Sequence, residues 1–389
     1  MKFFNMFKNP SFILLKNIVT LKNPAKLIHF ISKAIGRIIS LSMIIFLKII
    51  ENSLGLFIAL VDIRPRKKIG KKILVCRYKN YSLLSQFESY EKHHIDETLI
   101  DNGYEVDVFY WDENESIFFS QVKLWLTIRR LNPWIIFFSS YSPRKKRPSS
   151  QPSLKFLEIL RKKISSNFIF LWWDSCSDTF YDTEIKTLEK VKSLHLLMEN
   201  PSLDFGKKYK NVSNDSLIPL WISRSLAKPL KKDIDVAFSG QVDSYRDKRK
   251  VFIEYLMEQN IAGYIATPSR DQQLSHSKYA EILGRAKIGI NFSFSVDKHQ
   301  LKGRVYETLH SGALLLETKN PQTSVFFIDG EDYISFTDKE DMVKKIRYYL
   351  SHDKEREKIS KSGREKVLKL YNSELFMKKI LDHKNFIHY

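Results

Sequence analysis

The residues best suited to chemistry lie close together in residues 302–317, which read KGRVYETLHSGALLLE. Arg304 and Glu307 stand three residues apart, a spacing that places both side chains on one face of a helix. Gly312 falls where a helix end favours positive φ, and the apolar run behind it is typical of a buried parallel strand. A cation beside a carboxylate suits a ligand that is anionic at one end and carries hydroxyls at the other, such as a nucleoside diphosphate sugar. The same spacing also fits an ordinary helix with a surface ion pair.

The elements that would position this pair alternate between strands and helices. In the first half, strands are predicted at residues 72–78, 104–111, 134–139, 168–173 and 194–198, with helices at residues 85–100, 154–164 and 183–191. In the second half, strands are predicted at residues 235–239, 263–266 and 287–292 and directly after Gly312. The helices of that half are predicted at residues 249–259, 277–286, 341–350 and 351–370, with residues 337–340 as a capping box. This alternation is typical of doubly wound α/β domains.

The sequence therefore predicts two facing Rossmann-like domains, at residues 67–228 and 229–389, preceded by a separate segment at residues 1–66. In such a pair, ligands bind between the carboxyl ends of the strands. The second domain is expected to contribute the following residues there: Ser239, Gly240, Asn291 and the residues up to Ser295, Lys302, Gly303, Arg304 and Glu307.

The composition favours a globular cytoplasmic protein over a disulfide-rich, zinc-binding or nucleic-acid-binding one. Hydrophobic residues make up 43% of the 389 residues, enough for packed cores. Cys76 and Cys176 form neither a disulfide framework nor a zinc-type cluster, which favours a reducing, cytoplasmic location. Residues 1–72 hold 14 of the 64 Lys and Arg but two of the 44 Asp and Glu, so most of the net charge of +20 lies there. The rest of the chain contains no stretch in which basic and aromatic residues alternate as in nucleic-acid-binding modules. A nucleic-acid partner is therefore not expected.

Residues 1–66 are basic and apolar, and we expect them to be helical and to contact a membrane. Residues 38–61 are long enough to span a bilayer, but Lys48, Glu51 and Asn52 near the middle make a span costly. Basic residues flank the run on both sides, so the charges give no orientation, and a helix lying in the interface or a hairpin that dips into it satisfies both flanks. The expected location is the cytoplasmic face of a membrane. A pair of amphipathic helices packed on the globular body is the alternative.

Several stretches of the second domain resemble a known family. They are DVAFSG at residues 235–240, YAEILGRAKIGINFS at 279–293, LKGRVYETLHSGALLLET at 301–318, FFIDGEDYISF at 326–336 and the closing KKIRYYLSHDKEREKISKSGREKVL. In this order they resemble the nucleotide-binding half of GT-B glycosyltransferases, most closely the CgeB-like branch of the group 1 glycosyltransferases. The resemblance covers about a third of the chain. It implies a GT-B fold and transfer of a sugar from a nucleotide sugar to an acceptor, without a metal or other cofactor.

The resemblance also assigns roles to individual residues. A glutamate in the position of Glu307 holds the ribose hydroxyls, and an arginine in the position of Arg304 lies near the diphosphate. Gly240 marks a loop where the backbone approaches the ligand closely. One departure matters, because many retaining members carry a second glutamate eight residues before the first, where this chain has His299. Retention of configuration is therefore not implied.

The first domain matches the family less well, and its candidate residues rest on chemistry alone. Inverting transfer needs a base beside the acceptor hydroxyl. Asp174 follows a predicted strand, with Asp178 close behind, although a cap or loop role is the more usual one for such an aspartate. His93, His94 and Asp96 on the first helix are alternatives, although adjacent histidines are more typical of a solvated helix face. No metal site is predicted.

Four functions fit these observations to different degrees. The favoured one is a membrane-associated glycosyltransferase that acts on a glycan or a lipid-linked acceptor. A polyol-phosphate transferase that uses a donor of the CDP-glycerol type is the main alternative, because such enzymes also combine GT-B architecture with basic, membrane-bound surfaces. A charge-driven nucleic-acid-binding protein and a glycosyltransferase fold without activity are further alternatives.

Overall fold

The chain is described by a computed structural model at residues 72–80, 87–113, 116–139, 141, 150–173, 191, 193–197, 212–217 (backbone), 228–242, 247–267, 274–293, 301–370 and 373–382. Residues 63–389 belong to one compact unit. The segment predicted to contact a membrane, residues 1–66, lies outside the described residues. Among the described residues, no helix is both long and apolar enough to cross a bilayer.

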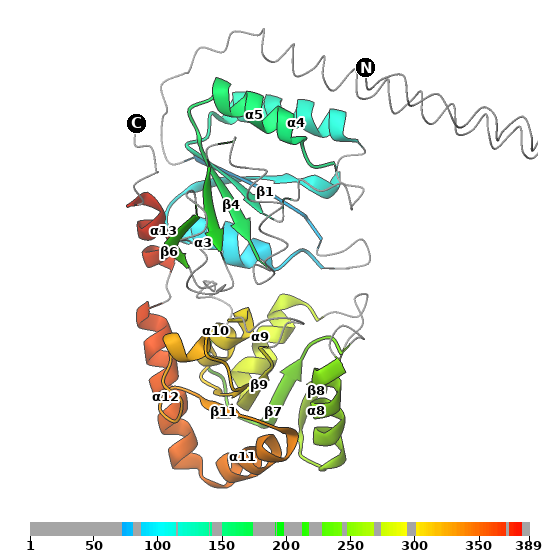
Figure 1. Cartoon of the computed structure of the whole chain (residues 1–389), viewed down its shortest axis with the longest axis vertical. Coiled ribbons are helices and arrows are strands. Elements are labelled where there is room, and N and C mark those ends of the chain that lie inside the picture. Colours follow the sequence, from blue (N-terminus) through cyan, green and yellow to red (C-terminus); the bar gives the residue numbers. More distant parts are fainter. Residues whose placement is uncertain are drawn as a thin grey trace, which may run out of the picture. The chain divides into compact units, whose positions relative to one another are not determined.

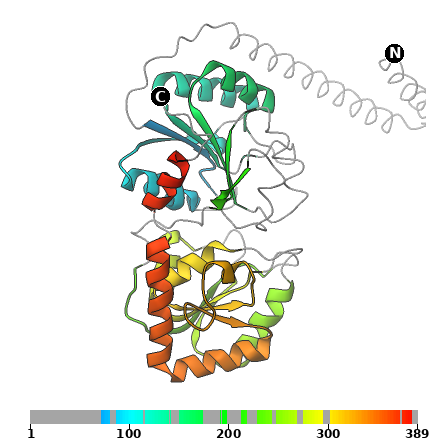
Figure 2. The ribbon, with the colours of Figure 1, turned by 60° about the vertical axis from the view of Figure 1, so that its left-hand side comes forward.

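The first sheet is parallel and six-stranded, in the order β2-β1-β3-β4-β5-β6 (Figure 1). Its strands are β1 (Lys72–Arg77), β2 (Glu105–Tyr110), β3 (Ile135–Ser139), β4 (Asn167–Trp172), β5 (Leu194–Leu197) and β6 (Val212–Leu217). Helices α4 (Ile117–Leu131) and α5 (Leu154–Lys163) lie over one face (Figures 1 and 2). The π-helix η2 (Lys92–Glu97) and α3 (Thr98–Asp101) lie on the other. Strands β3 and β4 are buried along their whole length, as their continuous apolar runs predict.

The second sheet is also parallel, with five strands in the order β11-β10-β9-β7-β8. Its strands are β7 (Ile234–Ser239), β8 (Gly263–Ala266), β9 (Ala286–Asn291), β10 (Leu314–Thr318) and β11 (Ile334–Phe336). The helices are α8 (Asp247–Glu258), α9 (His276–Arg285), α10 (Gly303–His310), α11 (Lys339–Ser351) and α12 (Asp353–Leu370). These bounds lie within about two residues of the sequence-based predictions for most elements. Two doubly wound α/β sheets are thereby confirmed.

Both sheets contain a point at which the strand order reverses. In the first sheet, β1 lies between β2 and β3, and in the second, β7 lies between β8 and β9. Crossover connections leave on opposite faces at such a point, so the carboxyl ends of the two central strands are open to a ligand. A ligand is therefore expected at the ends of β1 and β3 in the first sheet, and at the ends of β7 and β9 in the second.

Close packing fixes α10 against the second sheet. A Cβ atom on Gly289 of β9 would lie 2.5 Å from the methyl carbon of Thr308, so only glycine lets the helix approach this near. The last helix, α13 (Ser373–Leu381), contacts α3 and β6 of the first sheet. One buried apolar cluster includes residues of β1, β3, β4, α10 and α13, so it joins elements from both halves of the sequence.

Two predicted helix starts are wrong. The helix expected from residue 85 begins about six residues later, at η2, and residues 87–90 lie outside any helix. The capping box was expected to begin at Thr337, but Asp338 is the N-cap of α11, and its side chain accepts from the backbone N–H of Asp341 at 2.7 Å. The carboxylate of Asp341 accepts in turn from the backbone N–H of Thr337 at 3.1 Å. Both Thr and Asp are good caps, and the sequence alone does not decide between neighbours.

Replacing Gly312 with valine should destabilise the fold. Gly312 has φ +71°, as predicted for the residue after α10, and a β-branched side chain is strained there. We expect a loss of about 1–3 kcal/mol in the free energy of unfolding, measured by urea denaturation. Gly312→Asn is the control, because asparagine tolerates this conformation better. Equal losses from the two variants would contradict a backbone role.

Candidate functional site

Arg304 lies where the strand order of the second sheet reverses. Its Nη2 donates to the backbone oxygen of Ser239 at the end of β7 (2.6 Å), and its Nη1 donates to Asn291 Oδ1 at the end of β9 (3.3 Å). The guanidinium carbon is 5.3 Å from the centre of the Phe238 ring. The structure thus brings three predicted donor-binding residues together at the position where doubly wound sheets bind ligands.

The loop after β7 leaves space for a second guanidinium. A Cβ on Gly240 would lie 3.0 Å from Nη2 of Arg304 and 3.4 Å from Nη1 of Arg249, so a side chain there would displace one or both. Arg249 comes from α8, is 8% exposed, and donates to the carbonyl of Gln241 at 3.0 Å. Two guanidiniums beside exposed backbone suit a diphosphate, which offers many acceptor oxygens.

Glu307 lies one turn beyond Arg304 on α10, with its side chain 13% exposed. Its Oε2 accepts from the hydroxyl of Tyr279 at 2.7 Å, and its Oε1 lies 3.7 Å from Nε2 of His94. The second separation is longer than a hydrogen bond, so Oε1 can still accept from a ligand hydroxyl. Burial raises the pKa of Glu307, while the Tyr279 hydrogen bond and the charge of Arg304 oppose that rise.

Three imidazoles gather beside this carboxylate. The ring centres of His93 and His276 are 4.2 Å apart, and those of His94 and His276 are 5.5 Å apart. Burial, reinforced by the nearby His94 and His93, lowers the pKa of His276 to about 3, so His276 is neutral at physiological pH. The interpretation of the adjacent histidines as a solvated helix face is wrong for His94, which is 3% exposed.

The start of α10 completes the donor side. Lys302 is the N-cap residue and Gly303 the first residue of the helix, so the backbone N–H groups of the first turn begin here, one turn before Glu307. The predicted residues Ser295 and His299 lie outside the described residues.

The corresponding edge of the first sheet carries a different set of groups. The hydroxyl of Ser139, at the end of β3, donates to Oε1 of Glu91 (2.9 Å) and accepts from the indole N–H of Trp173 (2.8 Å). Glu91 precedes η2 and is 8% exposed. A carboxylate and an indole at the ligand-binding edge of a sheet suit a sugar or another hydroxyl-bearing acceptor.

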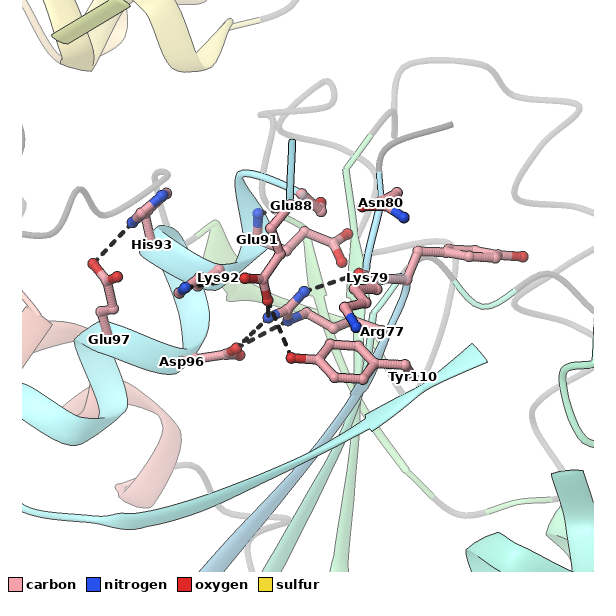
Figure 3. Close-up of polar contacts among 12 residues, drawn as sticks. Arg77, Lys79, Asn80, Glu88, Glu91, Lys92, His93, Asp96, Glu97 and Tyr110 are labelled. Atoms are coloured by element: carbon pink, nitrogen blue, oxygen red, sulfur yellow. Dashed lines mark hydrogen bonds and ion pairs between the residues drawn. The ribbon is translucent and has the colours of Figure 1, made fainter. Parts of the chain in front are cut away.

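A buried ion pair holds η2 against this edge. Arg77, at the end of β1, donates to Oδ2 of Asp96 (2.6 and 3.0 Å) and to Oε1 of Glu88 (2.6 Å), and Tyr110 donates to the same Glu88 oxygen (3.1 Å) (Figure 3). Burial raises the pKa of Asp96, and Arg77 opposes that rise. Asp96, an alternative candidate base, is thus engaged in fixing the segment that carries His93 and His94.

The other candidate bases, Asp174 and Asp178, lie outside the described residues. Within the part of the chain that the structure describes, no group of three or more His, Cys, Asp or Glu is placed to hold a metal ion.

Sequence reasoning missed several residues of this site: Glu91, Arg249, His276, Tyr279 and Glu317. Tyr279 was assigned to a helix and His276 lies just before the predicted start of that helix, but nothing in the sequence indicated that they lie near Glu307. Arg249 is one of several basic residues at residues 246–250, and only the fold distinguishes it. Only Glu317 could have been found from the sequence. An acidic residue in an otherwise apolar buried strand needs hydrogen-bond donors around it, which indicates a polar network.

Comparison with known proteins identifies the type of domain. Residues 224–382 match the protein family described as glycosyl transferase-like. The matched segment contains all the predicted donor-binding residues, from Ser239 to Glu307. Among curated proteins, no sequence matches this chain.

Solved structures extend the likeness over both sheets. Sucrose-phosphate synthase from Thermosynechococcus elongatus is 12% identical, with 79% of this chain and 98% of that chain covered and a TM-score of 0.53. HepE of Anabaena, solved in complex with UDP and glucose, is 10% identical, with 80% and 98% covered and a TM-score of 0.54. A glycosyltransferase from Rickettsia africae is 12% identical, with 81% and 98% covered and a TM-score of 0.51. The predicted GT-B fold of two Rossmann-like domains is confirmed.

Proposed function

We propose that this chain, a GT-B glycosyltransferase whose residues 224–382 match a glycosyl transferase-like family, transfers a sugar from a nucleoside diphosphate sugar to a glycan or a lipid-linked acceptor. The observation that carries the proposal is the position of Arg304. Its guanidinium joins the ends of β7 and β9 one helical turn from the buried carboxylate of Glu307. A cation and a carboxylate therefore lie one helical turn apart, an arrangement that suits a ligand with a diphosphate at one end and ribose hydroxyls at the other.

The negative charge that develops on the leaving group supports a direct role for Arg304 in the reaction. When the bond between the sugar and the diphosphate breaks, negative charge grows on the leaving phosphate. Arg304 and Arg249, held by backbone carbonyls of the loop after β7, would stabilise that charge without moving far. Interactions that strengthen as the bond breaks raise turnover as well as binding.

Glu307 would bind the ribose of the donor. Its Oε1 can accept from a ribose hydroxyl, and the ligand would then lie beside His94, which is 3.7 Å away. In this arrangement His94 lies between the nucleotide and Trp173, whose ring centre is 6.2 Å from that of His94, so its position fits a role in orienting the donor and a role as the base. Asp174 stays a candidate base for an inverting reaction.

The acceptor would bind at the edge of the first sheet, where Glu91, Ser139 and Trp173 form a connected polar group. We further propose that residues 1–66 hold the enzyme at the cytoplasmic face of a membrane, close to a lipid-linked acceptor. Fractionation of cells that express the full chain tests this attachment, and recovery in the soluble fraction would contradict it.

A donor screen tests the proposed function. The full chain is incubated with UDP- and GDP-sugars and, separately, with CDP-glycerol, and thermal shift and donor hydrolysis are measured. UDP is the first nucleotide to test, since the Anabaena neighbour was solved with UDP and glucose. We expect a nucleotide sugar to stabilise the protein and to be hydrolysed slowly in the presence of EDTA.

Each outcome of the screen has a distinct meaning. A response to CDP-glycerol alone would replace the proposal with a polyol-phosphate transferase. Activity that EDTA abolishes would contradict metal independence while leaving sugar transfer intact. Stabilisation by random DNA, together with no response to any nucleotide sugar, would contradict the proposal entirely.

A further inference from the structure

Glu317 is a fully buried carboxylate next to the donor side. It lies near the end of β10 with 0% of its surface exposed, within a strand that is otherwise apolar up to that point. Its Cα is in register with that of Asn291 on the neighbouring strand β9, so the two side chains point to the same face of the sheet. A buried acid is costly and needs hydrogen-bond donors around it.

The donors come from the ends of two strands. Asn291 Nδ2 donates to Oε1 of Glu317 at 2.8 Å, and the hydroxyl of Ser293 donates to the same oxygen. Asn320 and Thr323, which follow β10, also favour the charged form of the carboxyl group, and Asn320 Nδ2 donates to the hydroxyl of Thr323 at 2.9 Å. All four residues are themselves fully buried.

This network fixes the orientation of the Asn291 amide. A carboxylate accepts hydrogen bonds and donates none, so the amide nitrogen of Asn291 must face Glu317. The amide oxygen is then turned the other way, where it accepts from Nη1 of Arg304 at 3.3 Å. If the amide were reversed, its NH₂ group would face the guanidinium, and two donors would oppose each other.

We propose that Glu317 is a positioning residue for the transfer reaction: through the amide of Asn291 it holds the Arg304 guanidinium at the diphosphate site. The inference rests on the proposed function for its effect on catalysis. Its structural part, the orientation of Asn291 and Arg304, stands apart from that function. Glu317 touches neither substrate nor Arg304 directly.

The same geometry gives the site a dependence on pH. Burial raises the pKa of Glu317 to about 7, although hydrogen bonds from Ser293, Thr323, Asn291 and Asn320 oppose the rise. Below that pH the protonated carboxyl group can donate as well as accept, and Asn291 is no longer held in one orientation. Among the described residues, the other titratable and charged groups near the carboxyl group include Tyr333, whose pKa is raised to about 12 and which stays neutral, and Arg304 beyond Asn291. Activity should therefore rise as pH increases through about 7.

Two substitutions separate positioning from support of the fold. Glu317→Leu keeps the volume but removes the acceptor, and we expect kcat to fall on the order of 10- to 10²-fold, as for other small displacements of catalytic groups. Glu317→Gln places an amide there that, like the protonated carboxyl group, can donate as well as accept, and it does not titrate. We expect its activity at pH 8 to be close to that of the wild type below pH 7, and the step near pH 7 to be absent. Asp332→Asn is the matched control, a buried carboxylate that binds Lys366 at 2.7 Å in the same half of the chain.

Crystal structures of the full-length Glu317→Leu and Glu317→Gln variants complete the test. We expect the contact between Arg304 and Asn291 to be lost in the first variant, and the Asn291 amide to adopt both orientations in the second. An unmoved Arg304 in Glu317→Leu, or an unchanged pH profile in Glu317→Gln, would overturn the inference. If the wild-type chain used no nucleotide sugar, the proposed function would fail, and the crystal structures would still decide whether Glu317 positions Arg304.

Discussion

Replacement of Arg304 by alanine is expected to lower kcat about 10²-fold or more. The guanidinium is held by Ser239 and Asn291 at the switch point of the second sheet, so under the proposed function it would meet the leaving diphosphate already oriented. Such preorganised charge acts mainly in the transition state, where the phosphate oxygens gain negative charge. Steady-state kinetics with the donor found in the screen measures the effect, and kcat and kcat/KM should fall together.

Two control variants make the Arg304 result specific. Arg285→Ala removes an arginine of the same lobe that pairs with Asp233 and Glu281 away from the site, and we expect turnover close to that of the wild type. Arg304→Lys keeps the charge but loses the paired contacts, and we expect an intermediate rate. A fully active Arg304→Ala enzyme would show that the diphosphate binds elsewhere.

Replacement of Glu307 by alanine is expected to weaken nucleotide binding by about 10- to 100-fold, the value of one or two hydrogen bonds from ribose hydroxyls to a charged acceptor. The carboxylate is 13% exposed and partly screened from water, which strengthens those bonds. Calorimetric titration of the full chain with UDP, or with whichever nucleoside diphosphate the screen selects, measures the change. Binding should weaken more than kcat changes, because the ribose is remote from the bond that breaks.

The Glu307 variant also removes the partner of the Tyr279 hydroxyl, so the fold must be verified by circular dichroism and thermal unfolding. Glu281→Ala on α9 is the control, since its carboxylate pairs with Lys278 and Arg285 at the surface. Equal affinities of the Glu307→Ala variant and the wild type would remove the ribose-binding role.

Features that depend on local spacing could be predicted from the sequence. Most strands of both sheets follow from apolar runs with turn residues between them, and the positive φ of Gly312 follows from its place after a short helix. Arg304, Ser239 and Asn291 were expected at the ligand-binding edge because each ends a strand or begins a helix.

Features that depend on long-range packing could not be predicted. Tyr279 and His94 meet Glu307 from helices that are 28 and 213 residues away in sequence, and no periodicity records such a contact. The strand β6 has the polar sequence VSNDSL, which lacks the alternation that marks a strand. His94 of η2 was wrongly assigned to solvent because its burial depends on how α9 and α10 pack around it.

The central claim is that Arg304 and Glu307 hold the diphosphate and the ribose of a nucleotide donor. A crystal structure of the full chain with UDP, or with the nucleotide that the screen selects, tests it most directly. We predict phosphate oxygens within hydrogen-bonding distance of the Arg304 guanidinium and ribose hydroxyls at the Glu307 carboxylate. A nucleotide bound at the edge of the first sheet, or one that leaves both side chains without contact, would contradict the claim.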